Sequence, residues 1–185
     1  MKKNNGLSPE AVFLTITLFL AAMGFLVRRE YNFIYNSIVI YFGYLLLNYL
    51  ESRNKFKVKR YIRVLVIITV LLHNIFGQYF NMYKTIIWFD KMLHLFGTFS
   101  FALFFSSILE LTIGISHESK IYTFIMVTSI GVTVGVFLEN IEFILDVFMK
   151  TKTQHGVKDI NLDLIFNVVG SAIAGVFLSL RKNNV

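Results

Sequence analysis

Six apolar stretches, each close to twenty residues long, constrain this chain more than any other feature. They run over residues 11–27, 33–50, 61–80, 92–115, 121–145 and 162–180. A helix needs about twenty apolar residues to cross roughly 30 Å of hydrocarbon. A 185-residue chain that is 56% hydrophobic and only 16% charged also lacks the composition of a soluble domain. We therefore predict an all-α, polytopic transmembrane bundle of six helices, forming a single domain over residues 1–185.

The first apolar stretch also fits a secretory signal, because Lys2 and Lys3 precede it. No small-residue cleavage site precedes Arg28 and Arg29, and five further apolar stretches follow. We therefore expect a spanning helix rather than a cleaved peptide. The chain contains no cysteine, which excludes disulfides and thiolate chemistry.

Positive charge predicts the orientation, since Lys and Arg in short loops stay on the cytoplasmic side. We place both termini in the cytoplasm. The inner segments then hold most of the 18 Lys and Arg residues, namely Lys2, Lys3, Arg53, Lys55, Lys57, Lys59, Arg60, Arg63, Lys120, Arg181 and Lys182. The basic loop between the second and third stretches should attract anionic lipid headgroups. A nucleic-acid partner is not expected, because the chain has no nucleic-acid-binding module. The predicted localisation is multi-pass in the plasma membrane.

Polar side chains gather at the predicted outer ends of the last three helices. Residues three or four apart share one helix face. Three polar stripes result: Asp90 with His94; Glu139 with Glu142 and Asp146; and Asp159 with Asp163 and Asn167. We expect these stripes to meet at one depth and to line one outward-facing acidic cavity.

Small residues continue two of these stripes towards the cytoplasm. Gly135 and Gly131 follow Glu139 on its face, and Gly170 or Ser171 and then Ala174 follow Asn167. Small residues let membrane helices approach closely, so the acidic faces should also be contact faces. Bulky apolar residues, Phe137, Ile144, Ile165 and Phe166, are expected to face lipid.

Simpler roles remain open for the residues nearest the helix ends. Asp90 and Asp159 could be headgroup-level charges or helix caps, and Asp146 could be a solvated interfacial group. Glu139 and Asp163 lie deeper, where carboxylates are costly and are usually functional.

Amides and histidines have a competing structural role as well. Asn167 could link helices by a hydrogen bond. His73 and Asn74, in the third stretch, could join the cavity, but a hydrogen bond to a neighbouring helix is the more common role for such a histidine.

The order and spacing of the polar residues resemble those of the VanZ-like and YjdF-like families of small bacterial membrane proteins. Both patterns contain D-x-x-x-H, a glutamate-bearing helix and a final D-x-x-x-N-x-x-G helix, here Asp90, His94, Glu139, Asp163, Asn167 and Gly170. The YjdF-like pattern adds E-x-x-E-W and T-Q-G-x-x-x-D-x-x-x-D, matched by Glu139, Glu142, Thr153, Gln154, Asp159 and Asp163. Phe143 replaces the tryptophan, and His155 stands where the glycine is expected.

This resemblance covers residues 90–175, about half of the chain. It implies a cell-envelope protein of the bacterial plasma membrane and, through the VanZ-like proteins, a relation to glycopeptide resistance of the teicoplanin type. It supplies a fold and a site but no reaction, so whether the chain is an enzyme stays open.

Metal-assisted chemistry is the first function that these residues suggest. Hard divalent cations take several oxygen ligands, and a histidine also suits zinc or iron. The predicted ligands are Asp90, Asp159 and Asp163. Glu139 or Glu142 would be the general base, His94 a further ligand or proton donor, and Asn167 and Gln154 supporting groups. Such an ion could polarise a phosphoryl or acyl group of an envelope lipid, or activate water against it.

A non-enzymatic binding or transport protein is the alternative. Glu139, Glu142 and Asp163 could not all be ionised together at low dielectric, so one would carry a proton. That suits proton-coupled handling of a lipid or small amphiphile, although the chain shows no inverted repeat or Gly/Pro-broken helix. Walker, G-x-S-x-G, Rossmann and HExxH motifs do not occur, which disfavours the corresponding nucleotide, serine and zinc-protease chemistry.

Overall fold

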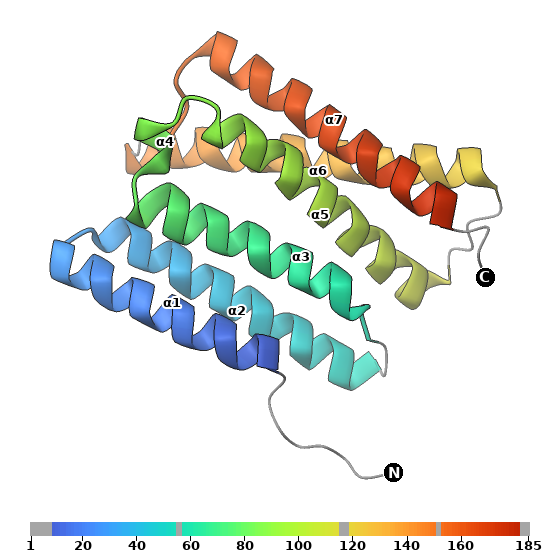
Figure 1. The fold of residues 1–185 in the computed structure, drawn as a ribbon, viewed down its shortest axis with the longest axis horizontal. Coiled ribbons are helices and arrows are strands. Elements are labelled where there is room, and N and C mark those ends of the chain that lie inside the picture. The colour runs from blue at the N-terminus through green and yellow to red at the C-terminus, as the bar shows by residue number, and fades with distance from the viewer. Residues whose placement is uncertain (1–8, 55–56, 115–118, 151–152, 182–185) are drawn as a thin grey trace.

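The computed structural model describes residues 9–54, 57–114, 119–150 and 153–181 as a bundle of helices (Figure 1). In chain order these are α1 (Pro9–Arg28), α2 (Tyr31–Asn54), α3 (Arg60–Leu71), the π-helical η1 (Leu72–Tyr79), the short α4 (Met82–Thr85), α5 (Phe89–Ile113), α6 (Lys120–Met149) and α7 (Val157–Arg181). No strand occurs in these ranges. Six helices are long and apolar enough to span a membrane, with η1 continuing α3. The predicted all-α, six-span architecture is confirmed.

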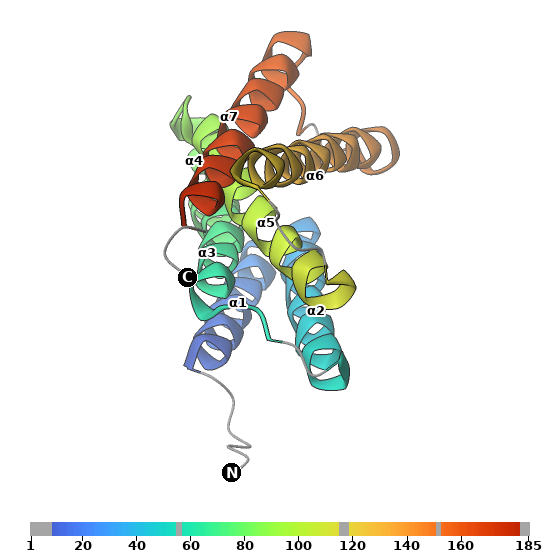
Figure 2. The same ribbon diagram turned by 90° about the vertical axis from the view of Figure 1, so that its right-hand side faces the viewer.

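The helices form two groups, α1 to α3 and α5 to α7, which meet where α3 packs against α5 (Figures 1 and 2). The start of α1 and the end of α7 lie at the same end of the bundle (Figure 1). This agrees with the prediction that both termini share one side. Among the charges used for the orientation, Lys2, Lys3, Lys55 and Lys182 lie outside the described residues.

Two apolar clusters hold the groups together. Leu14 and Leu18 of α1 pack with Ile67 and Leu71 of α3. The larger cluster joins α3, α5, α6 and α7 through Val58, Ile62, Ala102, Leu103, Val127 and Ala174. Few apolar side chains are fully buried in these clusters. Polar contacts near both ends of the bundle therefore also hold the helices together.

Small residues allow the close approach of α5, α6 and α7. A Cβ on Gly131 would collide with the side chain of Ser171, and one on Gly135 would lie 2.7 Å from Asn167. The backbone of Gly170 lies against the carbonyl oxygen of Leu95. The predicted contact faces of α6 and α7 are therefore confirmed.

Three features differ from the expectations. Helices α5 and α7 begin before the apolar stretches at residues 92 and 162, because Asp90 and Asp159 in their first turns interact favourably with the helix N-termini. The π-helical turn that ends the third span was not predicted.

Arg63 is the third difference, since it does not lie free in the basic loop. Its guanidinium donates to both oxygens of Glu51, at 2.7 and 2.5 Å, and is almost fully buried. Glu51 also accepts the backbone N–H of Val58 at 2.9 Å. This pair fastens the connection between α2 and α3, so Arg63 is not available to lipid headgroups.

Replacing Gly170 by alanine should destabilise the bundle by about 1–3 kcal/mol, because the new methyl group would overlap a backbone carbonyl that cannot move aside. Gly43 is the matched control, since a Cβ there meets nothing within 4 Å. Thermal unfolding of the two detergent-purified variants measures the difference. Equal melting temperatures would contradict the close packing of α5 and α7.

Candidate functional site

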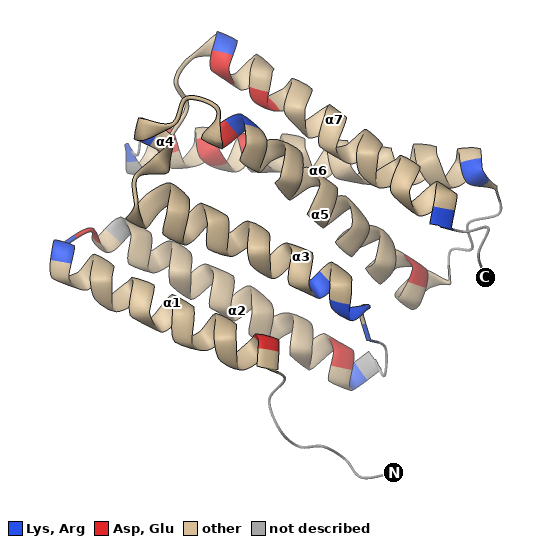
Figure 3. Ribbon diagram, in the orientation of Figure 1, with Lys and Arg blue, Asp and Glu red and all other residues tan. Residues whose placement is uncertain are grey.

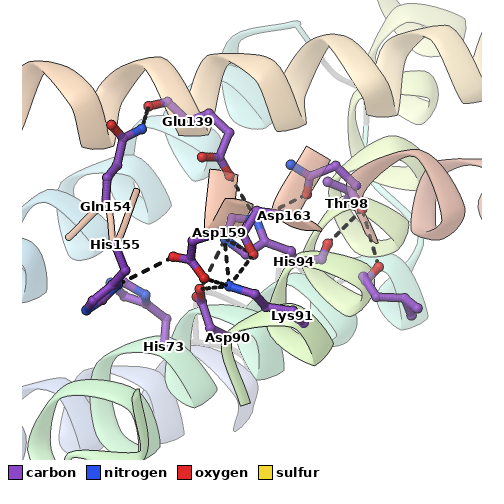
Figure 4. A network of polar contacts seen from close by, with 12 residues as sticks. His73, Asp90, Lys91, His94, Thr98, Glu139, Gln154, His155, Asp159 and Asp163 are labelled. Atoms are coloured by element: carbon purple, nitrogen blue, oxygen red, sulfur yellow. Dashed lines mark hydrogen bonds and ion pairs between the residues drawn. The ribbon is translucent and has the colours of Figure 1, made fainter. Parts of the chain in front are cut away.

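Polar side chains of α5, α6 and α7 converge at the end of the bundle opposite the termini (Figures 3 and 4). We call this set the acidic cluster; it comprises Asp90, Lys91, His94, Glu139, Asp159, Asp163 and Asn167. Three members lie at nearly equal helical distances from the other end: His94 is 19 residues before Ile113, Glu139 is 19 residues after Lys120, and Asp163 is 18 residues before Arg181. At 1.5 Å per residue each distance is about 28 Å. The stripes therefore meet at one depth.

Lys91, which follows the predicted site residue Asp90, lies at the centre of the cluster. Its side chain is 7% exposed. The ammonium lies 3.1 Å from Asp90 Oδ2 and 3.0 Å from Asp163 Oδ1, and it donates a short hydrogen bond to Asp159. Its spacing of three residues from His94 was the available signal, since it puts both side chains on one helix face.

His94 connects all three helices. Its Nε2 lies 3.5 Å from Asp90 Oδ1 and 3.8 Å from Asp163 Oδ1. Its Nδ1 lies 3.1 Å from Asn167 Oδ1 and 3.4 Å from Glu139 Oε1. The imidazole thus stands between two carboxylates on one side and an amide and a carboxylate on the other.

Three buried polar atoms of the cluster have no hydrogen-bond partner: Glu139 Oε1, Asp163 Oδ1 and Asn167 Nδ2. His94 Nδ1 lies 3.4 Å from Glu139 Oε1 without hydrogen-bond geometry. Lys91 lies 3.0 Å from Asp163 Oδ1 and donates its hydrogen bond to the other oxygen, Oδ2, at 3.2 Å. An unsatisfied buried polar atom costs about 1–3 kcal/mol. The cluster therefore has unused bonding capacity that a ligand could take up.

One donor atom each from Asp90, His94 and Asp163 lies within 4.8 Å of the others. Ligands on opposite sides of an ion at 2.0–2.6 Å are about 4–5 Å apart, so these three could share one metal with little movement. Asp159, predicted as a ligand, instead pairs with Lys91 and lies 3.4 Å from the exposed His155. The third donor beside Asp90 and Asp163 is thus His94, whereas the sequence suggested Asp159. The ligand role of Asp159 stays a prediction.

Thr153 and Gln154, which precede α7, are hydrogen-bonded to α6. Asp146 accepts hydrogen bonds from the backbone N–H groups of Thr153 and Gln154, at 2.7 and 2.9 Å. Asp146 is half-exposed, and in addition to contacting solvent it holds Thr153 and Gln154 against α6. Gln154 donates to the backbone carbonyl of Glu139 at 3.2 Å, so it supports the helix rather than the carboxylate. Glu142 lies one turn further along α6 and is half-buried.

His73 lies beside the cluster but bonds elsewhere. Its Nδ1 lies 2.6 Å from the Tyr83 hydroxyl and its Nε2 lies 2.9 Å from Gln78 Nε2. Burial raises the pKa of Tyr83 well above its usual range, so this hydroxyl keeps its proton. The neighbouring Asn74 bonds Ser37 of α2 at 3.1 Å. Both residues therefore link structural elements, which is the simpler of the two predicted roles.

Replacing Lys91 by methionine should destabilise the protein by about 3 kcal/mol in the presence of a chelator, because three carboxylates lose their shared cation. Lys84→Met is the control, since Lys84 is exposed on the short α4. Adding Asp159→Asn to Lys91→Met should recover part of the loss. Thermal unfolding measures all three, and equal stability of the two methionine variants would contradict a buried ammonium.

Comparisons with known proteins agree with the fold. The family model described as "Predicted membrane protein (DUF2238)" matches residues 9–184. An uncharacterised protein of Thermotoga maritima is 35% identical over 108 residues, which cover 55% of this chain and 53% of that protein. The chain thus matches about half the length of this relative. No solved structure matches.

These comparisons name neither of the two families that the motifs resemble, so the VanZ-like and YjdF-like relation stays a prediction. The DUF2238 match extends over all six spans and the acidic cluster, far beyond the half of the chain that carries the motifs. The chain belongs to the DUF2238 family of predicted membrane proteins.

Proposed function

We propose that the acidic cluster binds a divalent metal ion at the extracytoplasmic side of the plasma membrane and uses it to act on a cell-envelope lipid. The observation that carries this proposal is the grouping of Asp90, His94 and Asp163 within 4.8 Å, together with two buried carboxylate oxygens that accept no hydrogen bond, Glu139 Oε1 and Asp163 Oδ1. Buried carboxylate oxygens without a hydrogen bond are uncommon in native structures and are free to accept an additional ligand.

The charge balance of the cluster also favours a cation. Four carboxylates, Asp90, Glu139, Asp159 and Asp163, face Lys91 and His94. Even with a protonated imidazole, the carboxylates outnumber the cationic groups, and uncompensated charge within a membrane bundle is expensive. With His94 as a neutral metal ligand, a divalent ion would offset two of the three excess negative charges.

The donor set narrows the choice of metal. Magnesium and calcium prefer oxygen ligands alone, whereas an imidazole with carboxylates suits manganese, iron or zinc. Asp90, His94 and Asp163 would hold the ion, and Asn167 would orient the imidazole through its bond to Nδ1. The bound ion would polarise a phosphoryl or acyl oxygen.

Glu139 and Glu142 are the candidates for proton transfer. Glu139 Oε1 lies 3.4 Å from His94 and has no hydrogen-bond partner, so it can accept a proton from water or a substrate hydroxyl near the ion. Glu142 is less buried and could exchange that proton with the outside. The substrate is expected to be an envelope lipid, because the cluster lies about 28 Å from the inner helix ends, close to the full hydrocarbon thickness.

A non-enzymatic function is the second candidate, and one observation favours it. Lys91 already pairs with three carboxylates, so the cluster carries part of its own neutralising charge. Without a metal, the His94 and Glu139 pair would bind or carry a proton, as a proton-coupled binding or transport protein for an amphiphile requires.

The proposed orientation can be tested because the chain has no cysteine. Single cysteines at Lys84 or Lys158 should react with a membrane-impermeant maleimide on intact cells, and a cysteine at Lys57 should react only after permeabilisation. All three positions are exposed. The reverse labelling pattern would put the acidic cluster on the cytoplasmic side.

Elemental analysis of the detergent-purified protein tests the metal. Wild-type protein should carry a stoichiometric transition metal, and Asp163→Asn and Asp90→Asn should lose it because each removes a ligand charge. Glu110→Gln, at the inner end of α5, is the control and should keep it. No metal in the wild type, with Asp163→Asn equally or more stable, would refute the metal site and support the non-enzymatic candidate.

A further inference from the structure

An open apolar groove lies between two spanning helices, outside the acidic cluster. It is lined by α5 between Phe101 and Leu109 and by α6 between Met126 and Leu138, and its volume is about 670 Å³. This lies within the roughly 300–1,000 Å³ range of small-molecule sites. The hydroxyl of Thr133 donates to the carbonyl of Ser129 at 2.8 Å, so this donor is already satisfied and needs no hydrogen bond from a molecule in the groove. The groove therefore presents an apolar wall.

The groove extends downward from the depth of the acidic cluster. Its α6 wall extends from Leu138, next to Glu139, to Met126, which is about 18 Å at the helical rise of 1.5 Å per residue. Its α5 wall, from Phe101 to Leu109, lies about 10 to 22 Å below His94. The groove therefore crosses the middle of a hydrocarbon core of roughly 30 Å, and a long acyl chain that starts at the cluster would lie along it.

The face of α6 that lines the groove leads to Glu142, beside the cluster. Groove residues recur every three or four positions, at Met126, Ile130, Val134 and Leu138, and the next position in this series is Glu142. Residues four apart are neighbours on a helix surface. The apolar wall thus leads directly to a carboxylate beside the cluster.

The character of the wall favours a lipid tail over another helix. Helices that associate in membranes use small residues at the contact, as α6 and α7 do at Gly131 and Gly135. The groove instead presents mainly Phe, Ile, Leu and Met side chains. Bulky, adaptable apolar side chains fit a flexible hydrocarbon chain.

We infer that the α5–α6 groove holds an acyl chain of an outer-leaflet phospholipid whose headgroup lies at Glu142 and the acidic cluster. This inference rests on the proposed function, for which it supplies the substrate class: a lipid with a charged head and at least one long acyl tail. The groove selects the tail, and the cluster acts on the head.

Photocrosslinking tests the inference. The full chain is reconstituted in vesicles of phosphatidylglycerol and phosphatidylethanolamine containing a phosphatidylglycerol with a diazirine midway along one acyl chain. Crosslinked positions are then mapped by mass spectrometry. Crosslinks should be several-fold more frequent in the groove than at Phe19 and Phe42, which are similarly exposed apolar residues on α1 and α2.

Two tryptophan variants on the same helix separate filling of the groove from general disturbance. Val134→Trp fills the groove and should reduce crosslinking there several-fold. Val136→Trp lies outside the lining and should leave it unchanged. Uniform crosslinking over all lipid-facing residues would overturn the inference.

Metal content is measured on the same preparations, so that the two proposals can fail separately. Groove-specific crosslinking in a protein without metal would leave the acyl site in place and refute the metal chemistry. Stoichiometric metal with uniform crosslinking would leave the metal site in place and refute the acyl site.

Discussion

The buried ammonium of Lys91 is the interaction on which this end of the bundle depends. It joins Asp90 of its own helix to Asp159 and Asp163 of α7, where an isolated carboxylate would be costly to bury. Close contact between α5 and α7 at Gly170 brings these groups together. Packing and electrostatics are therefore coupled, because the helices can approach only if the carboxylates are neutralised, and Lys91 can neutralise them only if the helices approach.

His94 extends the network of polar contacts to α6, and several of the polar atoms around it are not hydrogen-bonded. The imidazole approaches Glu139 and Asn167 as well as the aspartates, yet three buried atoms around it find no hydrogen bond. A purely structural network would be expected to satisfy its members, since partial satisfaction is destabilising. Lys91 stabilises the aspartates of α5 and α7, and two of the three unsatisfied atoms, on Glu139 and Asn167, lie around His94 instead. Asp90 and Asp163 are shared, because they pair with Lys91 and also lie beside the imidazole of His94.

Local spacing in the sequence predicted much of this architecture. Apolar length identified all six spans, and the recurrence of polar residues every three or four positions brought Asp90, Asp163 and Glu139 to one depth. The central role of Lys91 was missed because its partners Asp159 and Asp163 are 68 and 72 residues away. A lysine at a helix end is ordinarily a solvated charge, and only the tertiary structure distinguishes the two cases. The pairing of Arg63 with Glu51, only 12 residues away, also escaped prediction, because an arginine beside a basic loop is ordinarily a solvated charge.

The positions of charge and apolar surface together restrict what such a protein can handle. A soluble metabolite would not need the apolar groove, and a neutral hydrocarbon would not need a carboxylate cluster at its end. The proposed amphiphile, with a polar head and a long tail, would use both, with the tail parallel to α6 and the head near Glu142. Whether the head is transformed or only held depends on how the excess negative charge is neutralised. A divalent ion beside His94 would provide an electrophile, whereas protonation of Glu139 would leave a site that can bind and release but has no group to polarise the substrate.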